Sequence, residues 1–341
     1  MNKRYPETMR AAYIQKYGKQ EKVTVGEVAT PVLQDDDVMV EIQAASVNPL
    51  DLKIRNAEVK FIVSYSFPLI LGHDLAGVVC ATGKNVTQYA VGDKVFSRPR
   101  DRRIGTFAQY LAVHQDDVAR MPHGVSFAEA AALPLVSLAA WQALVETAHV
   151  KRGDRILIHA GAGGLGLVAI QLAKHLGAVV STTASASSAD LVRRYGADEV
   201  IDYRTQQFDA VVKEMDVVLD TLGGDTLNRS FAVLRPGGCL VSLSGIPDRH
   251  FGEVMHLGTL KTLLLTLYGV GVHRKAKKHK VTYVFLFMRA SGEQLVEIAT
   301  LVEEGKLRAP IDREFPLEQT QAALDYVESG KAHGKVIVCA Q

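Results

Sequence analysis

The sequence predicts a two-domain α/β protein, in which a doubly wound parallel sheet follows an irregular antiparallel β-barrel. Its 341 residues are enough for two domains. Up to about residue 128, short strand-like runs are broken by turn residues, a pattern typical of a barrel. Beyond that point, nearly continuous apolar strands alternate with helices, which indicates a parallel sheet buried on both faces.

The barrel is expected from short runs in the first part of the chain. They are MRAAYIQ (9–15), DVMVEIQAASV (37–47), LAGVVCAT (75–82), DKVFS (93–97) and FAQYLAV (107–113). Turn residues separate these runs, and their short spacing favours antiparallel pairing. We therefore assign residues 1–129 to this first domain.

The parallel sheet is expected from the alternation that follows. Its predicted strands are RILIHA (155–160), AVVSTTA (178–184), EVIDY (199–203), AVVKEMDVVLDT (210–221), GCLVSLSG (238–245) and TYVFLFM (282–288). Helical patterns cover residues 127–146, 164–175, 189–196, 225–234 and 292–305. We assign residues 130–306 to this domain and expect residues 307–341 to return to the barrel, because domain termini are often close together.

Composition and charge exclude several classes of protein. The formal net charge is +2, so no global field would attract nucleic acid. The three cysteines are scattered, which argues against a disulfide framework and a cysteine-rich zinc lobe. The first residues lack an apolar stretch of signal-peptide type, and no run of about 18 apolar residues occurs. We therefore expect a cytoplasmic protein without stable membrane insertion.

A glycine motif predicts a dinucleotide site. Gly161, Gly163 and Gly166 fit G-x-G-x-x-G directly after a buried strand and open a helix. The first glycine permits a tight turn, the second lets the backbone approach a pyrophosphate, and the third lets the helix pack on the strand. Gly164 and Leu165 belong to the same helix N-terminus, whose N–H groups favour an anion. No Gly-Lys-Ser/Thr follows, which excludes a P-loop.

The end of the second parallel strand favours NADPH over NADH. A cofactor without a 2′-phosphate is normally held by an acidic residue about 20 positions after the glycines. Here no acid occurs before Asp190, whereas Ser185 and Ser188 can donate to a phosphate. Tyr203 and neighbouring arginines would add a phenol donor or positive charge. The alternative is that these hydroxyls only cap a helix.

Two later strand ends should face the same crevice. They are DTLGG (220–224) and SLSGIP (242–247). Because ligands bind at the carboxyl ends of the strands in such sheets, we assign Leu222, Ser244 and Gly245 to the cofactor as well.

With these residues assembled, the chain resembles the medium-chain dehydrogenase/reductase superfamily, and within it the zinc-independent NADPH:quinone oxidoreductases. The resemblance rests on AASVNPLDLKIRNA (44–57), LGHDLAGVV (71–79), VGDKVF (91–96), AAALPLVSLAAWQAL (130–144), HAGAGGLG (159–166), GADEVIDYR (196–204), LDTLGG (219–224) and GKAHGKVIV (330–338). It implies a GroES-like catalytic domain formed by both chain ends, a central Rossmann domain, an active site in the cleft between them, and a homodimer.

The resemblance also indicates that zinc is absent. Zinc-dependent relatives use three protein ligands, whose positions match Asn48, His73 and the Pro134–Leu135 pair here. Only His73 is a ligand, so we predict no metal. Without a metal, the favoured acceptors are quinones, or α,β-unsaturated carbonyl compounds, since conjugation spreads the charge left by hydride transfer.

The predicted catalytic residues are Asn48, Lys53 and Tyr65. Asn48 would donate an amide N–H to the acceptor's carbonyl oxygen, and Lys53 or Tyr65 would supply charge or a proton, although both also fit a surface role. Asn48 and Lys335, the latter in the GKAHGKVIV stretch, are also assigned to the cofactor.

Two further readings stay open. One is a reductase of alkenals, enones or enoyl thioesters, with Arg98, Arg100, Arg102 and Arg103 either attracting a phosphorylated carrier or simply solvated. The other is a weakly active, NADPH-binding redox sensor that contacts a partner through the basic segment 274–280. The stretch 258–281 joins this segment to an apolar run, and a solvated loop is favoured there over a membrane or nucleic-acid contact.

Overall fold

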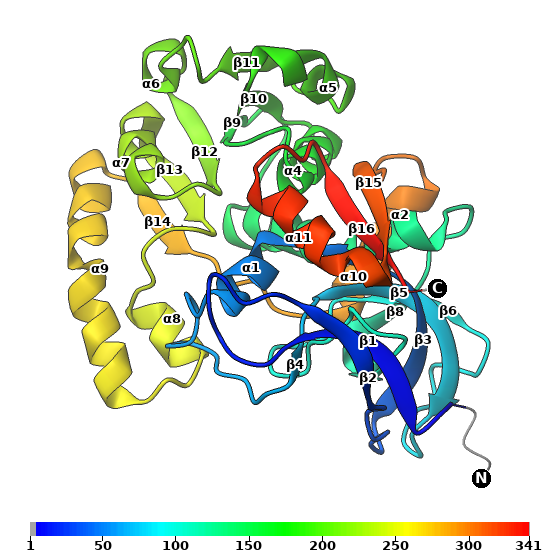
Figure 1. Ribbon diagram of the computed structural model, residues 1–341. Coiled ribbons are helices and arrows are strands. Elements are labelled where there is room, and N and C mark those ends of the chain that lie inside the picture. The colour runs from blue at the N-terminus through cyan, green and yellow to red at the C-terminus, as the bar shows by residue number, and fades with distance from the viewer. Residues whose placement is uncertain (1–4, 341) are drawn as a thin grey trace. The chain divides into compact units, whose positions relative to one another are not determined.

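The computed structural model describes residues 5–340, which divide into two units (Figure 1). The described residues up to Leu138 and from Arg289 onward form the first unit, and Ala139–Met288 form the second. The sequence places the second boundary at residue 306, after the helix α10 (Gly292–Glu303). In the structure α10 belongs to the first unit, where its Glu303 accepts a hydrogen bond from the His123 backbone.

The first unit is the expected barrel, and its named strands pair antiparallel except β15 and β16, which are parallel. Its main sheet has the order β15-β16-β3-β5-β6-β8, and β7 also pairs with β3. The strands are β3 (Asp37–Val47), β5 (Asp74–Thr82), β6 (Lys94–Ser97), β7 (Tyr110–His114), β8 (Val118–Arg120), β15 (Ile311–Pro316) and β16 (Lys335–Cys339). A smaller sheet has the order β2-β1-β4, from β1 (Thr8–Ile14), β2 (Thr24–Ala29) and β4 (Leu69–Ile70).

Strand β3 brings distant parts of the first unit together. It pairs antiparallel with β16, where Val336 lies opposite Val47, and with β5, where Asp74 lies opposite Ser46. Both faces of these strands are largely buried, and their apolar side chains contribute to two core clusters. The end of β3 therefore meets the start of β16 and the start of β5.

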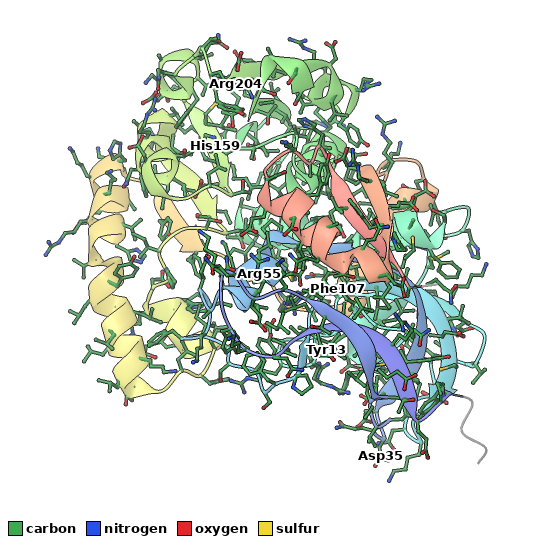
Figure 2. The ribbon with its side chains drawn as sticks, in the orientation of Figure 1. Tyr13, Asp35, Arg55, Phe107, His159 and Arg204 are labelled. Carbon is green, nitrogen blue, oxygen red and sulfur yellow. The ribbon has the colours of Figure 1, made fainter. Side chains whose placement is uncertain are left out.

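Helices cover this barrel at defined places. Helix α1 (Pro49–Arg55) follows β3 directly, and its buried Arg55 donates to Glu328 on α11 (Thr320–Glu328) at 2.9 Å. Figure 2 labels Arg55 and the core residue Phe107 in this unit. The predicted helix 127–146 is divided into α2 (Phe127–Ala131), α3 (Pro134–Trp141) and a π-helical stretch, Gln142–Thr147, since Pro134 has no N–H to continue α2.

The second unit is a parallel sheet with the strand order β11-β10-β9-β12-β13-β14. The strands are β9 (Arg155–Ile158), β10 (Val179–Ala184), β11 (Glu199–Asp202), β12 (Met215–Asp220), β13 (Leu234–Ser242) and β14 (Thr282–Phe285). Counted along the chain this is the order 3-2-1-4-5-6 of a Rossmann fold. The predicted fold class, Rossmann sheet plus GroES-like barrel, is confirmed.

Helices connect these strands. They are α4 (Gly164–His175), α5 (Ala189–Arg194), α6 (Phe208–Val211), α7 (Gly224–Ser230), α8 (Arg249–Val254) and α9 (Thr259–His279). The strand expected over residues 210–221 is shorter than predicted, because Val211 ends α6 and Glu214, with a φ of 55°, turns the chain before β12 begins. The strand order reverses between β9 and β12, which is where such sheets bind their ligands.

Candidate functional site

The glycine loop joins β9 to α4 as the motif predicts. Gly163 caps the N-terminus of α4 with extended backbone and no side chain in the way. A Cβ on Gly166 would lie 2.7 Å from the Gly161 Cα and closer still to the Ala160 carbonyl oxygen, and one on Gly161 would collide with Thr182. The first and third glycines are therefore needed for packing. Gly163 is free of such contacts and leaves the backbone open to a ligand.

Hydroxyl groups gather at the end of β10. The buried Ser185 Oγ lies 2.9 Å from Ser187 Oγ and 3.0 Å from Ser188 Oγ, within the turn Ala186–Ser188. Tyr203 follows β11 next to this turn, since its N–H donates to Ala184 O, and its ring is largely exposed with the Arg204 guanidinium over it. The structure thus brings Ser185, Ser188 and Tyr203 together at neighbouring strand ends, in a set rich in donors.

The ends of β12 and β13 are tied to each other. The buried Asp220 accepts hydrogen bonds from the Leu222 and Gly223 N–H groups and from Ser242 Oγ. The Ser244 N–H donates to Ser242 Oγ in turn. Leu222 and Ser244, two of the predicted cofactor residues, therefore lie on adjoining loops, and Gly245 lies where a Cβ would meet Ser242.

His159 is a buried residue that links these strand ends. Its Nε2 lies 3.0 Å from Ser230 Oγ, whose hydroxyl donates to Thr226 O, and its Nδ1 lies 3.3 Å from Thr183 Oγ1. This network fits a neutral ring with the proton on Nε2. Burial, opposed by the charge of Asp220, lowers the pKa of His159 to about 4. Figure 2 labels His159 in the second unit. No pattern in the sequence singles out His159 as a functional residue.

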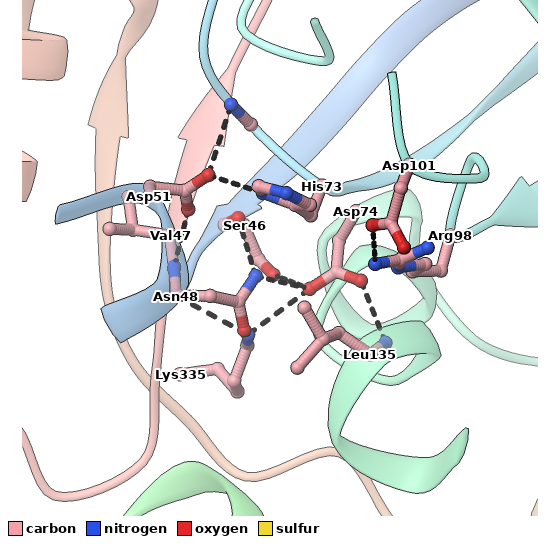
Figure 3. A network of polar contacts seen from close by, with 11 residues as sticks. Ser46, Val47, Asn48, Asp51, His73, Asp74, Arg98, Asp101, Leu135 and Lys335 are labelled. Carbon is pink, nitrogen blue, oxygen red and sulfur yellow. Dashed lines mark hydrogen bonds and ion pairs between the residues drawn. The ribbon is translucent and has the colours of Figure 1, made fainter. Parts of the chain in front are cut away.

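The first unit holds a buried polar network at the end of β3 (Figure 3). Asp74 is fully buried, and its Oδ2 accepts hydrogen bonds from Ser46 Oγ at 2.6 Å and Asn48 Nδ2 at 2.8 Å. Its Oδ1 accepts one from the Leu135 N–H at 2.7 Å. The Lys335 Nζ lies 3.2 Å from the same Oδ2. The carboxylate is therefore surrounded by donors, one of them a cation.

Asn48 and Lys335, both predicted site residues, meet in this network. Lys335 Nζ lies 2.5 Å from Asn48 Oδ1 and 3.3 Å from Val47 O, so all three of its protons have acceptors once Asp74 is included. The Asn48 amide donates to Asp74 and, at 3.3 Å, to Ser46 O. The free amide N–H that the sequence led us to expect on Asn48 is thus already engaged.

A second part of the network holds His73. Asp51, on the first turn of α1, accepts hydrogen bonds from the Asn48 backbone N–H at 2.8 Å and from the Gly72 N–H. Its Oδ1 lies 2.6 Å from His73 Nδ1. The His73 Nε2 is buried and has no hydrogen-bond partner among the described residues. The carboxylate partner of His73 is therefore Asp51 and not the adjacent Asp74.

Lys53 and Tyr65 lie outside this network. Lys53, on α1, is half-buried, and in residues 5–340 its ammonium group makes no hydrogen bond or ion pair. Tyr65 is also half-buried. Burial, followed by the charge of Asp101, raises the pKa of Tyr65 to about 12, so its hydroxyl keeps its proton at neutral pH.

The arginines of the stretch 98–103 are not simply solvated. Arg98 is buried and donates to Asp101 at 2.6 Å, and its Nε and Nη1 have no partner among the described residues. Arg100 and Arg103 form ion pairs with Asp117 and Asp37. Because Arg98 is buried, the expectation that it is simply solvated is wrong. Its ion pair with Asp101, three residues along the chain, offsets the cost of taking its charge out of water.

Comparisons with known proteins agree with this architecture. The family model "Alcohol dehydrogenase GroES-like domain" matches residues 34–123, and "Zinc-binding dehydrogenase" matches residues 195–338. The protein named "NAD(P)H oxidoreductase RTN4IP1, mitochondrial" from Mus musculus is 34% identical over 97% of this chain and 89% of its own length. The 2-methylene-furan-3-one reductase of Solanum lycopersicum is 32% identical, over 98% and 79%.

A solved structure, the quinone oxidoreductase from Coxiella burnetii, superposes with a TM-score of 0.83 at 30% identity, covering 98% of this chain and all of its own. The chain therefore belongs to the quinone-oxidoreductase-like family of the medium-chain dehydrogenase/reductase superfamily. As such it is an oxidoreductase that uses a nicotinamide cofactor. In the part of the chain that is described, no helix is both long enough and apolar enough to cross a membrane.

The residues at the zinc positions do not fit a zinc ion. Within residues 5–340, no group of three or more His, Cys, Asp or Glu side chains is arranged to hold a metal. Asn48 replaces a charged ligand and has both polar atoms of its amide engaged. The Lys335 ammonium lies 3.2 Å from the Asp74 carboxylate and would repel a second cation there.

Proposed function

We propose that the protein is an NADPH-dependent reductase that transfers hydride to quinones without a metal. The observation that carries this proposal is the buried Lys335 ammonium beside Asn48 and Asp74. It supplies a fixed positive charge at the place where zinc-dependent relatives bind their metal. A quinone needs little further stabilisation of its hydride adduct, because conjugation delocalises the negative charge that hydride transfer creates.

The preference for NADPH is supported by the end of β10. Ser185 and Ser188 offer hydroxyl donors there, and Tyr203 stands at the neighbouring strand end. A carboxylate in the position of Ser185 would repel a 2′-phosphate, and none is present. The glycine loop would hold the pyrophosphate, with Gly163, Gly164 and Leu165 at the N-terminus of α4.

The chemistry needs one hydride and one proton. The bound cofactor supplies the hydride from its nicotinamide ring, and the quinone becomes a hydroquinone after it also takes up a proton. Lys335 lowers the energy of the negative charge on the acceptor, while Asn48 fixes the position of its ammonium group. Lys53 is our candidate for the proton donor, because its half-buried ammonium has no partner within the described residues. Tyr65 is the alternative.

A second candidate function is the reduction of α,β-unsaturated carbonyl compounds. It is favoured by the 32% identity to a protein named 2-methylene-furan-3-one reductase. The same residues would serve, although an enolate left by hydride transfer needs its proton more than a hydroquinone anion does.

The test is NADPH oxidation, followed by nicotinamide absorbance, with a benzoquinone and a 2-alkenal in parallel and with or without a chelator. Chelator-insensitive turnover of the quinone is the expected result. Turnover of the alkenal alone moves the protein to the second function. A stoichiometric metal in the purified protein, with loss of activity on chelation, contradicts the metal-free mechanism. Tight NADPH binding without turnover of either acceptor favours the redox-sensor reading.

The homodimer and the cytoplasmic location remain predictions. The printed name of the mouse relative includes the word mitochondrial, which makes the location a question for experiment. Sedimentation of the purified protein and fractionation of the source cells test them separately.

A further inference from the structure

Helix α9 exposes a row of large apolar side chains. Their exposed fractions are 71% for Leu260, 56% for Leu263, 50% for Leu264, 64% for Leu267 and 65% for Tyr268. The spacing of three and four residues places them on one face of the helix. The opposite face, with Leu265, Gly269, Val272 and Ala276, is buried against the second unit's sheet and helices. The row therefore lies on a helix whose other face is packed within its own unit. Figure 1 shows the course of α9, in yellow, with α8 near its first turns.

Helix α8 extends this apolar surface. It packs on the first turns of α9, where a Cβ on Gly252 would lie 2.8 Å from Thr262 Oγ1. Its last residue, Val254, is 59% exposed. The two helices together present apolar side chains at the same end of α9.

The same outward face becomes basic toward the C-terminus of α9. Arg274, Lys277 and Lys278 are exposed there, and Lys280 is the exposed C-cap residue just beyond the helix; within residues 5–340 none of these four forms an ion pair. Arg274 and Lys278 continue the line of Leu260, Leu263 and Leu267 along the helix. No Asp or Glu occurs in the sequence between Glu253 and Glu293, so these cations have no acidic neighbour on their own helix. Its electrostatic complement is a dense negative surface.

We propose that α8 and α9 dock the protein on an anionic membrane surface, with the leucine row in the boundary between headgroups and acyl chains. The basic residues would contact lipid phosphates. An interfacial helix needs an apolar face and adjoining cations, and α9 carries both in one line. Nucleic acid would use the cations but leave the leucines in water, and a second copy of this chain would bring further positive charge to the same face. This inference is independent of the proposed catalytic function.

The test is flotation of the purified protein with vesicles of phosphatidylcholine containing about one-third phosphatidylserine, and with pure phosphatidylcholine vesicles. We expect binding to the anionic vesicles only. L263E/L267E should weaken vesicle binding at least tenfold, because in the wild type both leucines are removed from water on binding. K277E/K278E should weaken it at least tenfold at low salt, and added salt should weaken wild-type binding.

Matched controls are V32E, at another exposed apolar residue, and K16E/K19E, at exposed lysines of the first unit. Both should bind like the wild type, and L263E/L267E should keep wild-type unfolding temperature because its leucines are exposed. Failure of the wild type to bind, or binding that survives L263E/L267E, overturns the proposal. A third result also overturns it: the wild type binds no vesicles, and L263E/L267E has a lower sedimentation coefficient than the wild type. The apolar row would then join two copies of this chain.

Discussion

The Nζ of Lys335 lies 2.5 Å from the Oδ1 of Asn48, although 287 residues separate them in the chain. The pairing of β16 with β3 brings them together, because Val336 lies opposite Val47. Both side chains are buried, and both also contact Asp74. A cation fixed in this way keeps its position while a reaction proceeds, which is the condition for electrostatic stabilisation without reorganisation.

Replacing Lys335 separates its structural role from its catalytic role. K335M leaves the buried Asp74 carboxylate without its cation, so we expect the free energy of unfolding to fall by about 3 kcal/mol. In K335M/D74N no uncompensated charge remains, and much of the stability should return. Turnover should stay about 100-fold below the wild type in both variants, because the positive charge is missing in both.

Denaturant unfolding and steady-state kinetics measure the two effects, with the exposed K331M as the control. Recovery of both stability and turnover in the double variant would contradict a role for the ammonium in the reaction.

The proton donor is tested on two acceptors. K53M should slow turnover of a 2-alkenal by about 100-fold and that of a benzoquinone much less, since only the enolate depends strongly on prompt protonation. The unfolding temperature should not change, because Lys53 has no side-chain partner in the described part of the chain. Y65F is the parallel variant. The phenol that it removes is protonated at neutral pH in the wild type, because burial raises the pKa of Tyr65 to about 12. Loss of alkenal turnover in Y65F but not K53M would transfer the role to Tyr65.

Cofactor preference is tested at the end of β10. S185D places a carboxylate among the hydroxyls of Ser187 and Ser188, where we propose that the 2′-phosphate binds. NADPH affinity should fall at least tenfold by charge repulsion, while NADH affinity changes little or rises. Fluorescence titration gives both constants. S329D, at an exposed serine of the first unit, controls for the added charge. Equal weakening of both cofactors would place the phosphate elsewhere.

The glycine loop offers a matched pair of substitutions. G166A should lower the free energy of unfolding by about 2 kcal/mol, because its Cβ would press on Gly161 and Ala160 and push α4 off β9. G163A meets only Ala160 O, at 3.4 Å, so the fold should tolerate it. Its cofactor affinity should still fall if the pyrophosphate approaches this backbone. Calorimetry measures both quantities, and wild-type affinity in G163A would argue against that approach.

Local patterns were enough to predict the strand order and the glycine loop of the second unit, but not the helix α9, because a solvated loop was favoured at the basic segment 274–280. Long-range pairing explains what they missed in the first unit. The strand, glycine loop and helix are consecutive in sequence, so α4 begins and ends at the predicted residues 164 and 175. The network around Asp74 joins Ser46, Asn48 and Lys335 through the register of β3, which no local pattern encodes. The sequence prediction assigned α10 to the wrong domain for a similar reason. The spacing of its apolar residues is that of any helix with one buried face, whether it packs on a barrel or on a parallel sheet.

The buried His159 predicts a pH dependence of stability. In the unfolded chain its ring takes up a proton near pH 6.5, whereas in the folded protein burial lowers the pKa of His159 to about 4. Its contribution is therefore complete above pH 6.5 and is lost progressively as the pH falls toward 4. The full loss is about 3 kcal/mol.

The measurement is denaturant unfolding at intervals between pH 7.5 and pH 4 for the wild type and H159Q, which cannot titrate there. Other groups contribute to both proteins, so the informative quantity is the difference between them. The difference in free energy of unfolding should shrink as the pH falls, because protonation of His159 in the unfolded chain destabilises only the wild type. A constant difference between the wild type and H159Q would mean that His159 is protonated as easily in the folded protein as in the unfolded chain.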